Sequence, residues 1–146
     1  MGDLELKVIR ALNQDSRRSF REIAKELGTS ASVVIKKVKK SEESGAIKGY
    51  IPILDPADFG YALLAVIGLR ISHGQLIETQ RKIARDPRAL AIYDVTGEWD
   101  SIVIAQFKNR QDLNRFIKAV LSQKYVERTM THVVLNVVKD ERRVIV

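Results

Sequence analysis

The fold of the first third of this chain is decided by residues 19–50, SFREIAKELGTSASVVIKKVKKSEESGAIKGY. Ser19 and Glu22 have the spacing of a capping box, which predicts that a helix begins there. Gly28 follows that helix, and glycine readily takes the left-handed conformation that ends helices. The segment therefore predicts a short helix, a tight turn and then a second helix.

The second predicted helix has an apolar face and a cationic face. Thr29 or Ser30 is placed to cap its N-terminus. At about 100° per residue, the inward face contains Val34, Val38 and Ser41. The opposite face contains Ser32, Lys36, Lys39 and Lys40, with Lys37 on the flank. No acidic residue lies between positions 30 and 41, so this surface is suited to approach phosphates, although a lysine run is more commonly a solvated helix face.

The elements around this pair of helices favour a phosphate-binding surface over a solvated helix face. Residues 3–13 predict an amphipathic helix, capped by Asp3, with apolar residues at Leu4, Val8, Ile9, Ala11 and Leu12. Residues 47–54 are expected to form a strand or ribbon, with a turn at Gly49 and an edge position at Pro52. Three helices followed by a ribbon are typical of a winged helix-turn-helix, which lays its last helix in the major groove of DNA.

Composition narrows the class of partner. The net charge of the 146-residue chain is +7, which favours an anionic partner. The first 50 residues hold 11 basic and 7 acidic side chains, against 14 and 11 in the remainder, so the excess is concentrated in the first third. The absence of cysteine excludes disulfides and thiolate metal sites, and His73 and His132 lack metal-ligand spacing.

The chain is expected to be cytoplasmic, with no membrane partner and no cofactor. Its N-terminus alternates charged and apolar residues, unlike a signal peptide. The longest apolar run, residues 61–69, is too short to cross a bilayer as a helix.

A domain boundary is predicted at Asp55-Pro56, giving domains of residues 1–54 and 55–146. The second domain is predicted to contain strands at residues 61–71, 89–96, 101–107 and 126–138. Its first helix spans residues 75–85, with Leu76, Ile77, Ile83 and Ala84 facing inward. Its second helix is capped by Asn109, with Leu113, Phe116, Ile117, Val120 and Leu121 facing inward. This α+β order is the ferredoxin-like βαββαβ arrangement, with both helices on one sheet face and a second copy of the chain as the expected cover for the other.

In these features the chain resembles the Lrp/AsnC transcription regulators, also called feast/famine regulatory proteins. The resemblance in the first domain rests on Leu12, Arg17, Ser19, Glu22, Ile23, Ala24, Leu27, Gly28, Ser30, Val34, Val38, Glu42, Gly45, Ile47, Gly49 and Tyr50. It continues through LDPADFGY (54–61), VTGEWD (95–100) and RTMTHVVL (128–135), and so covers nearly the whole chain. Two positions depart from the family pattern. Lys37 stands where arginine is common and lacks its bidentate fork, and Ser41 replaces a leucine, which is expected to loosen the packing of the recognition helix.

The resemblance implies a regulator that binds double-stranded DNA as a homodimer, assembling further to an octamer. The predicted DNA-binding residues are Arg17, Ser30, Ser32, Lys36, Lys37, Lys39 and Lys40. Among them, Ser32 is the best candidate for reading a base edge, whereas the lysines suit phosphates.

The resemblance also implies that a small molecule, often an amino acid, binds between subunits of the second, RAM-type domain. The predicted effector-binding residues are Gly97, Glu98, Trp99, Asp100, Thr129 and Thr131. A turn at Gly97 exposes backbone N–H groups that can hold a carboxylate. Asp100 either accepts hydrogen bonds from an α-ammonium or fixes the loop by bonding backbone N–H groups. Thr129 and Thr131 share a strand face, and ordinary β propensity explains them equally well.

Two other functions fit the same architecture. The sirohaem decarboxylases resemble it and are enzymes, but here His132 is the only candidate for that chemistry, and the cationic helix has no role in it. A DNA-compacting architectural protein would use the same lysines without sequence preference. We therefore expect a regulator that is not an enzyme, and we assign no catalytic residue and no metal ligand.

Overall fold

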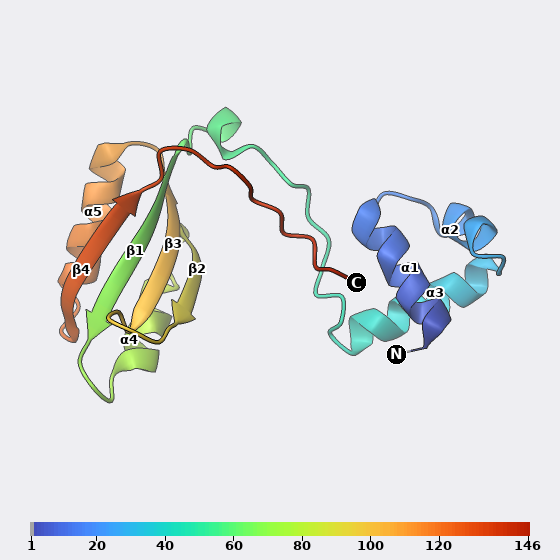
Figure 1. Cartoon of the computed structure of the whole chain (residues 1–146), viewed down its shortest axis with the longest axis horizontal. Coiled ribbons are helices and arrows are strands. Elements are labelled where there is room, and N and C mark those ends of the chain that lie inside the picture. The colour runs from blue at the N-terminus through green and yellow to red at the C-terminus, as the bar shows by residue number, and fades with distance from the viewer. Residues whose placement is uncertain (1) are drawn as a thin grey trace. The chain divides into compact units, whose positions relative to one another are not determined.

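The computed structural model describes residues 2–146, which divide into two compact units (Figure 1). One unit, called the head below, contains the residues up to Ile53 together with Lys139–Val146. The other, called the sheet unit, contains Leu54–Val138. Each unit has a hydrophobic core of its own.

The last eight residues belong to the head, whereas the sequence predicts a second domain of residues 55–146. The side chain of Arg10 donates a hydrogen bond to the main-chain oxygen of Val146 at 2.7 Å. Asn13 donates another to the main-chain oxygen of Val144 at 2.8 Å. These contacts join residues more than 130 positions apart, so no local sequence pattern predicts them.

The head contains three helices, α1 (Asp3–Gln14), α2 (Phe20–Glu26) and α3 (Ala31–Glu43). Val8, Ile23 and Val34, one from each helix, meet in its core with no exposed surface. The complete cluster consists of Val8, Ala11, Leu12, Ile23, Ala24, Val34 and Val38. The predicted inward face of α3 is confirmed, because Val34, Val38 and Ser41 are all buried.

The predicted helix boundaries of α2 and α3 are confirmed by their caps. Ser19 and Glu22 bond reciprocally as a capping box at the start of α2. Gly28 has a φ of +63°, and Ser30, rather than Thr29, caps α3 by accepting a hydrogen bond from the Val33 N–H. The prediction for α1 was wrong in one respect. Asp3 lies inside the first turn and pairs with Lys7 at 2.7 Å, while Gly2 occupies the cap position without a side-chain bond.

The predicted ribbon at residues 47–54 does not form a strand within the described chain. A strand is defined by hydrogen bonds to a neighbouring strand, and this extended segment pairs with none in the single chain. Pro52 also lacks an N–H group to donate. The segment leads into a short 3-10 helix, η1 (Pro56–Phe59), which ends at Gly60 with a φ of +79°.

The sheet unit has the predicted ferredoxin-like order of elements. These are β1 (Leu63–Ile71), α4 (Leu76–Ile83), β2 (Ala89–Asp94), β3 (Ser101–Phe107), α5 (Arg110–Leu121) and β4 (Val126–Val133). The strands form one antiparallel sheet in the order β2-β3-β1-β4, so the apolar β1 is an interior strand, as predicted. Both helices lie against the same face of this sheet (Figure 1).

The two faces of the sheet differ in burial. On the helix-covered face, Ile67 of β1 and Val103 of β3 are completely buried, and the rings of Phe107 and Phe116 meet edge to face with centroids 5.3 Å apart. The opposite face, called the open face below, carries Val66, Gly68, Ile102, Ile104, Tyr93, Met130 and His132. On this open face Tyr93 is 56% exposed and Met130 is 45% exposed.

Several inward residues of the helices were predicted wrongly. Ile77, Ala84 and Leu121 are exposed, whereas Thr79 is buried. Helix α4 has only eight residues, and its sheet-facing line runs through Leu76, Thr79 and Ile83, so Ile77 is rotated away from the sheet. The other residues of α5 that were predicted to face inward do so. Asn109 caps this helix, as predicted.

The last strand is shorter than predicted, ending at Val133 rather than Val138. Its partner β1 begins at Leu63, and the last bond between the two segments runs from the Val134 N–H to the Leu64 oxygen at 2.9 Å. Beyond that point β1 offers no further pairing positions. Strand β2 likewise ends at Asp94 rather than Thr96.

Candidate functional site

Helix α3 presents Ser32, Lys36 and Lys39 to solvent on the side opposite its packed face. The nearest carboxylate to Lys39 belongs to Glu43 at 3.9 Å, at the limit of an ion pair, and the Lys39 side chain is 74% exposed. A pair so exposed contributes little and leaves the ammonium available to an incoming anion.

Sequence reasoning missed Ile35 on the same surface. Its side chain is 49% exposed, and it lies one helical turn from Ser32 and from Lys39. A signal existed, because Ile35 lies off the face formed by Val34 and Val38. An apolar branched side chain in a cationic surface can contact the methyl group of thymine.

The other two lysines of α3 are held differently. The ammonium group of Lys40 bonds Oε2 of Glu5 on α1 at 3.1 Å. Lys37 is half-buried, and its main-chain oxygen accepts a hydrogen bond from Ser41 at 3.0 Å. The structure therefore brings Lys36 and Lys39 together on the solvent side of α3 and turns the Lys40 charge toward α1.

Ser41 is buried and hydrogen-bonded at the position where the family favours leucine. Its hydroxyl is completely buried and lies within hydrogen-bonding distance of the Lys37 oxygen and, at 3.4 Å, of Oε1 of Glu5. Every buried side-chain nitrogen and oxygen of residues 2–146 has a hydrogen-bonding partner. Ser41 thus makes a polar contact between α1 and α3 at this position.

Ser30 and Arg17 lie at the ends of helices. The Ser30 hydroxyl caps α3 and lies 2.9 Å from the Ser32 hydroxyl. The Arg17 side chain is 90% exposed, and its Nε lies 3.3 Å from Asp15. Hydrogen bonds from Arg17, that from its main-chain N–H foremost, lower the pKa of the Asp15 carboxyl.

The connection between β2 and β3, residues 95–100, lies on the open face and is called the hairpin loop below. Gly97 has a φ of +106°, which disfavours any residue with a side chain. Trp99 lies directly over Gly68 of β1. A Cβ atom added to Gly68 would come within 2.6 Å of the indole, so only glycine allows this contact.

Two arginines from neighbouring strands hold the hairpin loop. The guanidinium of Arg128 on β4 lies 4.9 Å from the centre of the Trp99 ring and bonds the Glu98 carboxylate at 2.8 Å. Arg70 on β1 donates a hydrogen bond to the main-chain oxygen of Glu98. Sequence reasoning assigned no role to either arginine or to Gly68, although a glycine inside an apolar strand signals a close approach by another group.

Asp100 fixes the hairpin loop to β1. Its Oδ2 accepts a hydrogen bond from the Ile71 N–H at 2.8 Å, and its own N–H donates to the Leu69 oxygen at 2.9 Å. Of the two predicted roles, the structure shows the one in which the carboxylate bonds a backbone N–H group.

Thr129 and Thr131 lie on the opposite face of the sheet from Trp99. They pair with Leu69 and Ile67, whose side chains point toward the helices. Arg128 and Met130, the alternate residues of β4, share the open face with the hairpin loop. The sheet itself therefore separates the two threonines from the loop within one chain.

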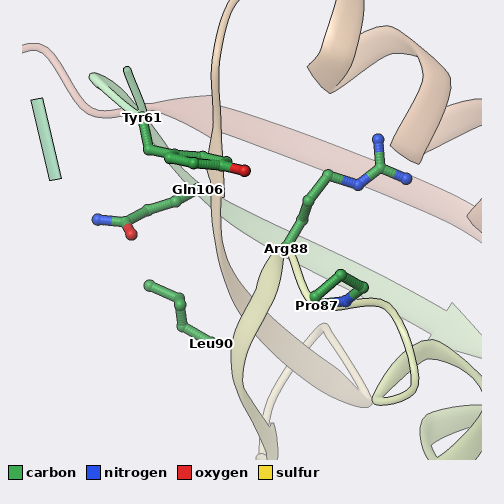
Figure 2. A pocket seen from close by; sticks show the side chains of 5 residues that line it. All are labelled: Tyr61, Pro87, Arg88, Leu90 and Gln106. Carbon is green, nitrogen blue, oxygen red and sulfur yellow. The ribbon is translucent and has the colours of Figure 1, made fainter. Parts of the chain in front are cut away.

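A shallow hollow of about 210 Å³ lies elsewhere on the sheet unit (Figure 2). It is lined by Tyr61, Pro87, Arg88, Leu90 and Gln106. The guanidinium of Arg88 points away from Leu90 and Gln106 (Figure 2). It bonds Asp86 at 2.7 Å and Asp112 at 2.8 Å. Its hydrogen bond lowers the pKa of the Asp86 carboxyl. The charge of Arg88 is therefore paired with two carboxylates of the sheet unit itself.

Two further observations bear on other kinds of site. Among residues 2–146, no three acidic or histidine side chains converge in a way that could hold a metal ion. None of the helices described has the length and apolar composition needed to span a bilayer. His132 lies on the exposed side of β4, paired with Val66.

The chain belongs to the Lrp/AsnC family. Residues 1–40 match the AsnC-type helix-turn-helix domain and residues 64–144 match the Lrp/AsnC ligand binding domain. The chain is therefore a transcriptional regulator of the Lrp/AsnC type with a DNA-binding helix-turn-helix and a ligand-binding domain.

Relatives and solved structures agree with that assignment. An uncharacterised HTH-type transcriptional regulator of Pyrococcus abyssi is 49% identical, over 98% of this chain and 97% of its own. The regulator FL11 of Pyrococcus furiosus is 34% identical, over 96% and 93%. Among solved structures, a Neisseria meningitidis transcriptional regulator in complex with L-Met has a TM-score of 0.90 at 22% identity, covering 99% of this chain and 96% of its own. Escherichia coli AsnC has a TM-score of 0.89 at 21% identity, covering 97% and 96%.

Proposed function

We propose that this protein binds specific DNA sites through the exposed face of α3 and that an amino acid bound to its sheet unit modulates this binding. The observation that carries the proposal is the division of α3 into a packed face and a cationic face. Val34 and Val38 anchor the helix in the head, while Lys36 and Lys39 extend into solvent. A helix held in this way presents its charges to phosphates without losing its packing.

The proposed DNA contacts follow from the placement of each residue. In this proposal, DNA phosphates are contacted by Lys36, Lys37 and Lys39. Arg17, just before the N-terminus of α2, contacts the sugar-phosphate backbone of the DNA. Ser30 and Ser32 lie near the N-terminal end of α3, which is the end of a recognition helix that reaches base edges.

Ile35 is expected to add preference for thymine. Replacing Ile35 by alanine should weaken the preferred site by roughly 5- to 30-fold, within the range of one apolar contact to a base. Replacing the contacted thymine by deoxyuridine, which lacks the methyl group, should cost the native protein a similar factor. Fluorescence anisotropy with the four combinations of protein and DNA would test this, because the two losses should not add. Fully additive losses would place Ile35 away from the thymine.

The effector is proposed to bind at the hairpin loop. Gly97 gives the loop a conformation in which backbone N–H groups can face a carboxylate, and Asp100 holds its base. Glu98 and Trp99 are fixed by Arg128 on the open face. The structural neighbour from Neisseria meningitidis was solved with L-Met, which supports an amino acid as the class of effector. Thr129 and Thr131 face away from this loop, so they are not part of the site proposed within one chain.

A homodimer is proposed to complete the molecule, with further assembly of dimers to an octamer. The open face carries partly exposed apolar side chains, and the extended segment before the sheet unit exposes Ile51 and Ile53 by 82% and 79%. A second copy of the chain can cover such surfaces. Two heads held in this way would place their recognition helices about 34 Å apart on a pseudo-palindromic site.

The test of the proposed function is DNA binding to the region upstream of the protein's own gene, measured at two salt concentrations with a panel of amino acids. The expected result is site-selective binding that falls by roughly 10³-fold between about 50 and 200 mM salt and changes with one amino acid. Binding that ignores both the site and the amino acids would instead indicate an architectural protein. Affinity that does not depend on salt would contradict the phosphate contacts.

A further inference from the structure

The carboxylate of Glu5 is buried at the contact between α1 and α3. Its side chain is 5% exposed, although Glu5 lies in the first turns of a surface helix. Both oxygens are engaged by α3, because Oε2 lies 3.1 Å from the Lys40 ammonium and Oε1 lies 3.4 Å from the Ser41 hydroxyl. The two partners are consecutive residues of α3.

A buried carboxylate requires partners of this kind. Burying an ionised carboxylate is strongly unfavourable unless it is paired and hydrogen-bonded. The hydrogen bond from Lys40 lowers the pKa of the Glu5 carboxyl, and the nearby charge of Lys37 adds to the effect. Glu5 therefore stays ionised, and moving Lys40 away would leave its charge buried and uncompensated.

We propose that Glu5 is a positioning residue for DNA recognition, which holds Lys40 against α1 and so removes this lysine from the phosphate-binding surface. This inference rests on the proposed DNA binding by α3. The stem of Lys40 is exposed on that helix, with 63% of its side chain accessible, so the ammonium has a path to solvent and is retained by Glu5.

The salt dependence of DNA binding distinguishes a lysine that contacts phosphate from one that does not. Each lysine–phosphate contact contributes about 0.9 to the slope of log K against log salt concentration. Lys36→Ala should therefore reduce the slope by about 0.9 for each head, whereas Lys40→Ala should leave it unchanged.

Glu5→Gln is the decisive variant, because it keeps the shape and the partner for Ser41 but releases the ammonium of Lys40. Its slope should increase by up to about 0.9 for each head as Lys40 gains a phosphate. The double variant Glu5→Gln with Lys40→Ala should return to the native slope. Asp3→Asn is the matched control, because it removes one negative charge from α1 but breaks only the exposed pair with Lys7. A purely structural role for Glu5 would lower the melting temperature and leave every slope unchanged.

A second measurement keeps the inference testable apart from DNA. In a double-mutant cycle of unfolding, Glu5→Gln and Lys40→Ala should be coupled by roughly 3- to 30-fold in the unfolding constant. Absence of coupling, or a Lys40→Ala slope as low as that of Lys36→Ala, would overturn the positioning role. Failure of the proposed function looks different: the native protein would then show no salt-dependent binding, while the coupling in the unfolding cycle would remain.

Discussion

Replacing both Lys36 and Lys39 by alanine is expected to weaken binding to all DNA sequences by roughly 10³-fold at about 0.1 M salt. Each phosphate contact contributes roughly eightfold between 1 M and 0.1 M salt, and a dimer would lose four of them. The helix should stay in place, because alanine is a good helix former and neither lysine belongs to the core. Fluorescence anisotropy over a range of salt concentrations, on the preferred site and on a random duplex, would measure the loss.

The matched control is the pair Lys82→Ala and Lys118→Ala, which removes the same charge from α4 and α5 of the sheet unit. If affinity falls equally in the control, the effect comes from the net charge of the chain and not from α3. A loss confined to the preferred site would also contradict the assignment, because phosphate contacts carry no sequence information.

Replacing Gly68 by alanine is expected to displace Trp99 and disorganise the hairpin loop. The new Cβ atom would lie 2.6 Å from the indole, well inside van der Waals contact. Trp99 is the only tryptophan of the chain, so its fluorescence reports the change directly. Emission should shift to longer wavelength, and the free energy of unfolding of the sheet unit should fall by about 1–3 kcal/mol, as for other overpacked sites. The response of DNA binding to effector should be lost, while DNA binding without effector remains.

A double-mutant cycle provides the control for Gly68→Ala. In a Trp99→Leu background the indole is absent, so adding the alanine methyl should cost much less stability than it does in the native chain. Equal costs in both backgrounds would show that the added methyl is harmful to β1 itself. An unchanged emission spectrum in the single variant would show that Trp99 does not lie over Gly68.

Local patterns predicted the helix-turn-helix well because its signals lie within a few residues of each other. The capping box of Ser19 and Glu22, the left-handed Gly28 and the apolar face of Val34 and Val38 are all confirmed. Features that depend on distant partners were missed. The ion pair of Glu5 with Lys40 spans 35 positions, and the residues next to each partner do not predict the pairing.

The hairpin loop shows a second limit of prediction from local patterns. Thr129, Thr131 and Trp99 were placed in one site because all three belong to segments that resemble the family. Which face of a sheet a residue occupies depends on strand register, and a shift of one position reverses every side chain. Only the observed pairing of Thr131 with Ile67 shows that the threonines point toward the helices.

Because the last eight residues contact α1, the chain enters and leaves the sheet unit from the same head. The head is assembled from both ends of the polypeptide, so the sheet unit is inserted into it in the manner of a guest domain. The two peptide segments that join guest and host leave the sheet side by side, since Val134 bonds Leu64 at their origin. After a single backbone cut between residues 47 and 54, the hydrogen bonds of Arg10 and Asn13 to the tail would hold two fragments that are no longer joined by the chain.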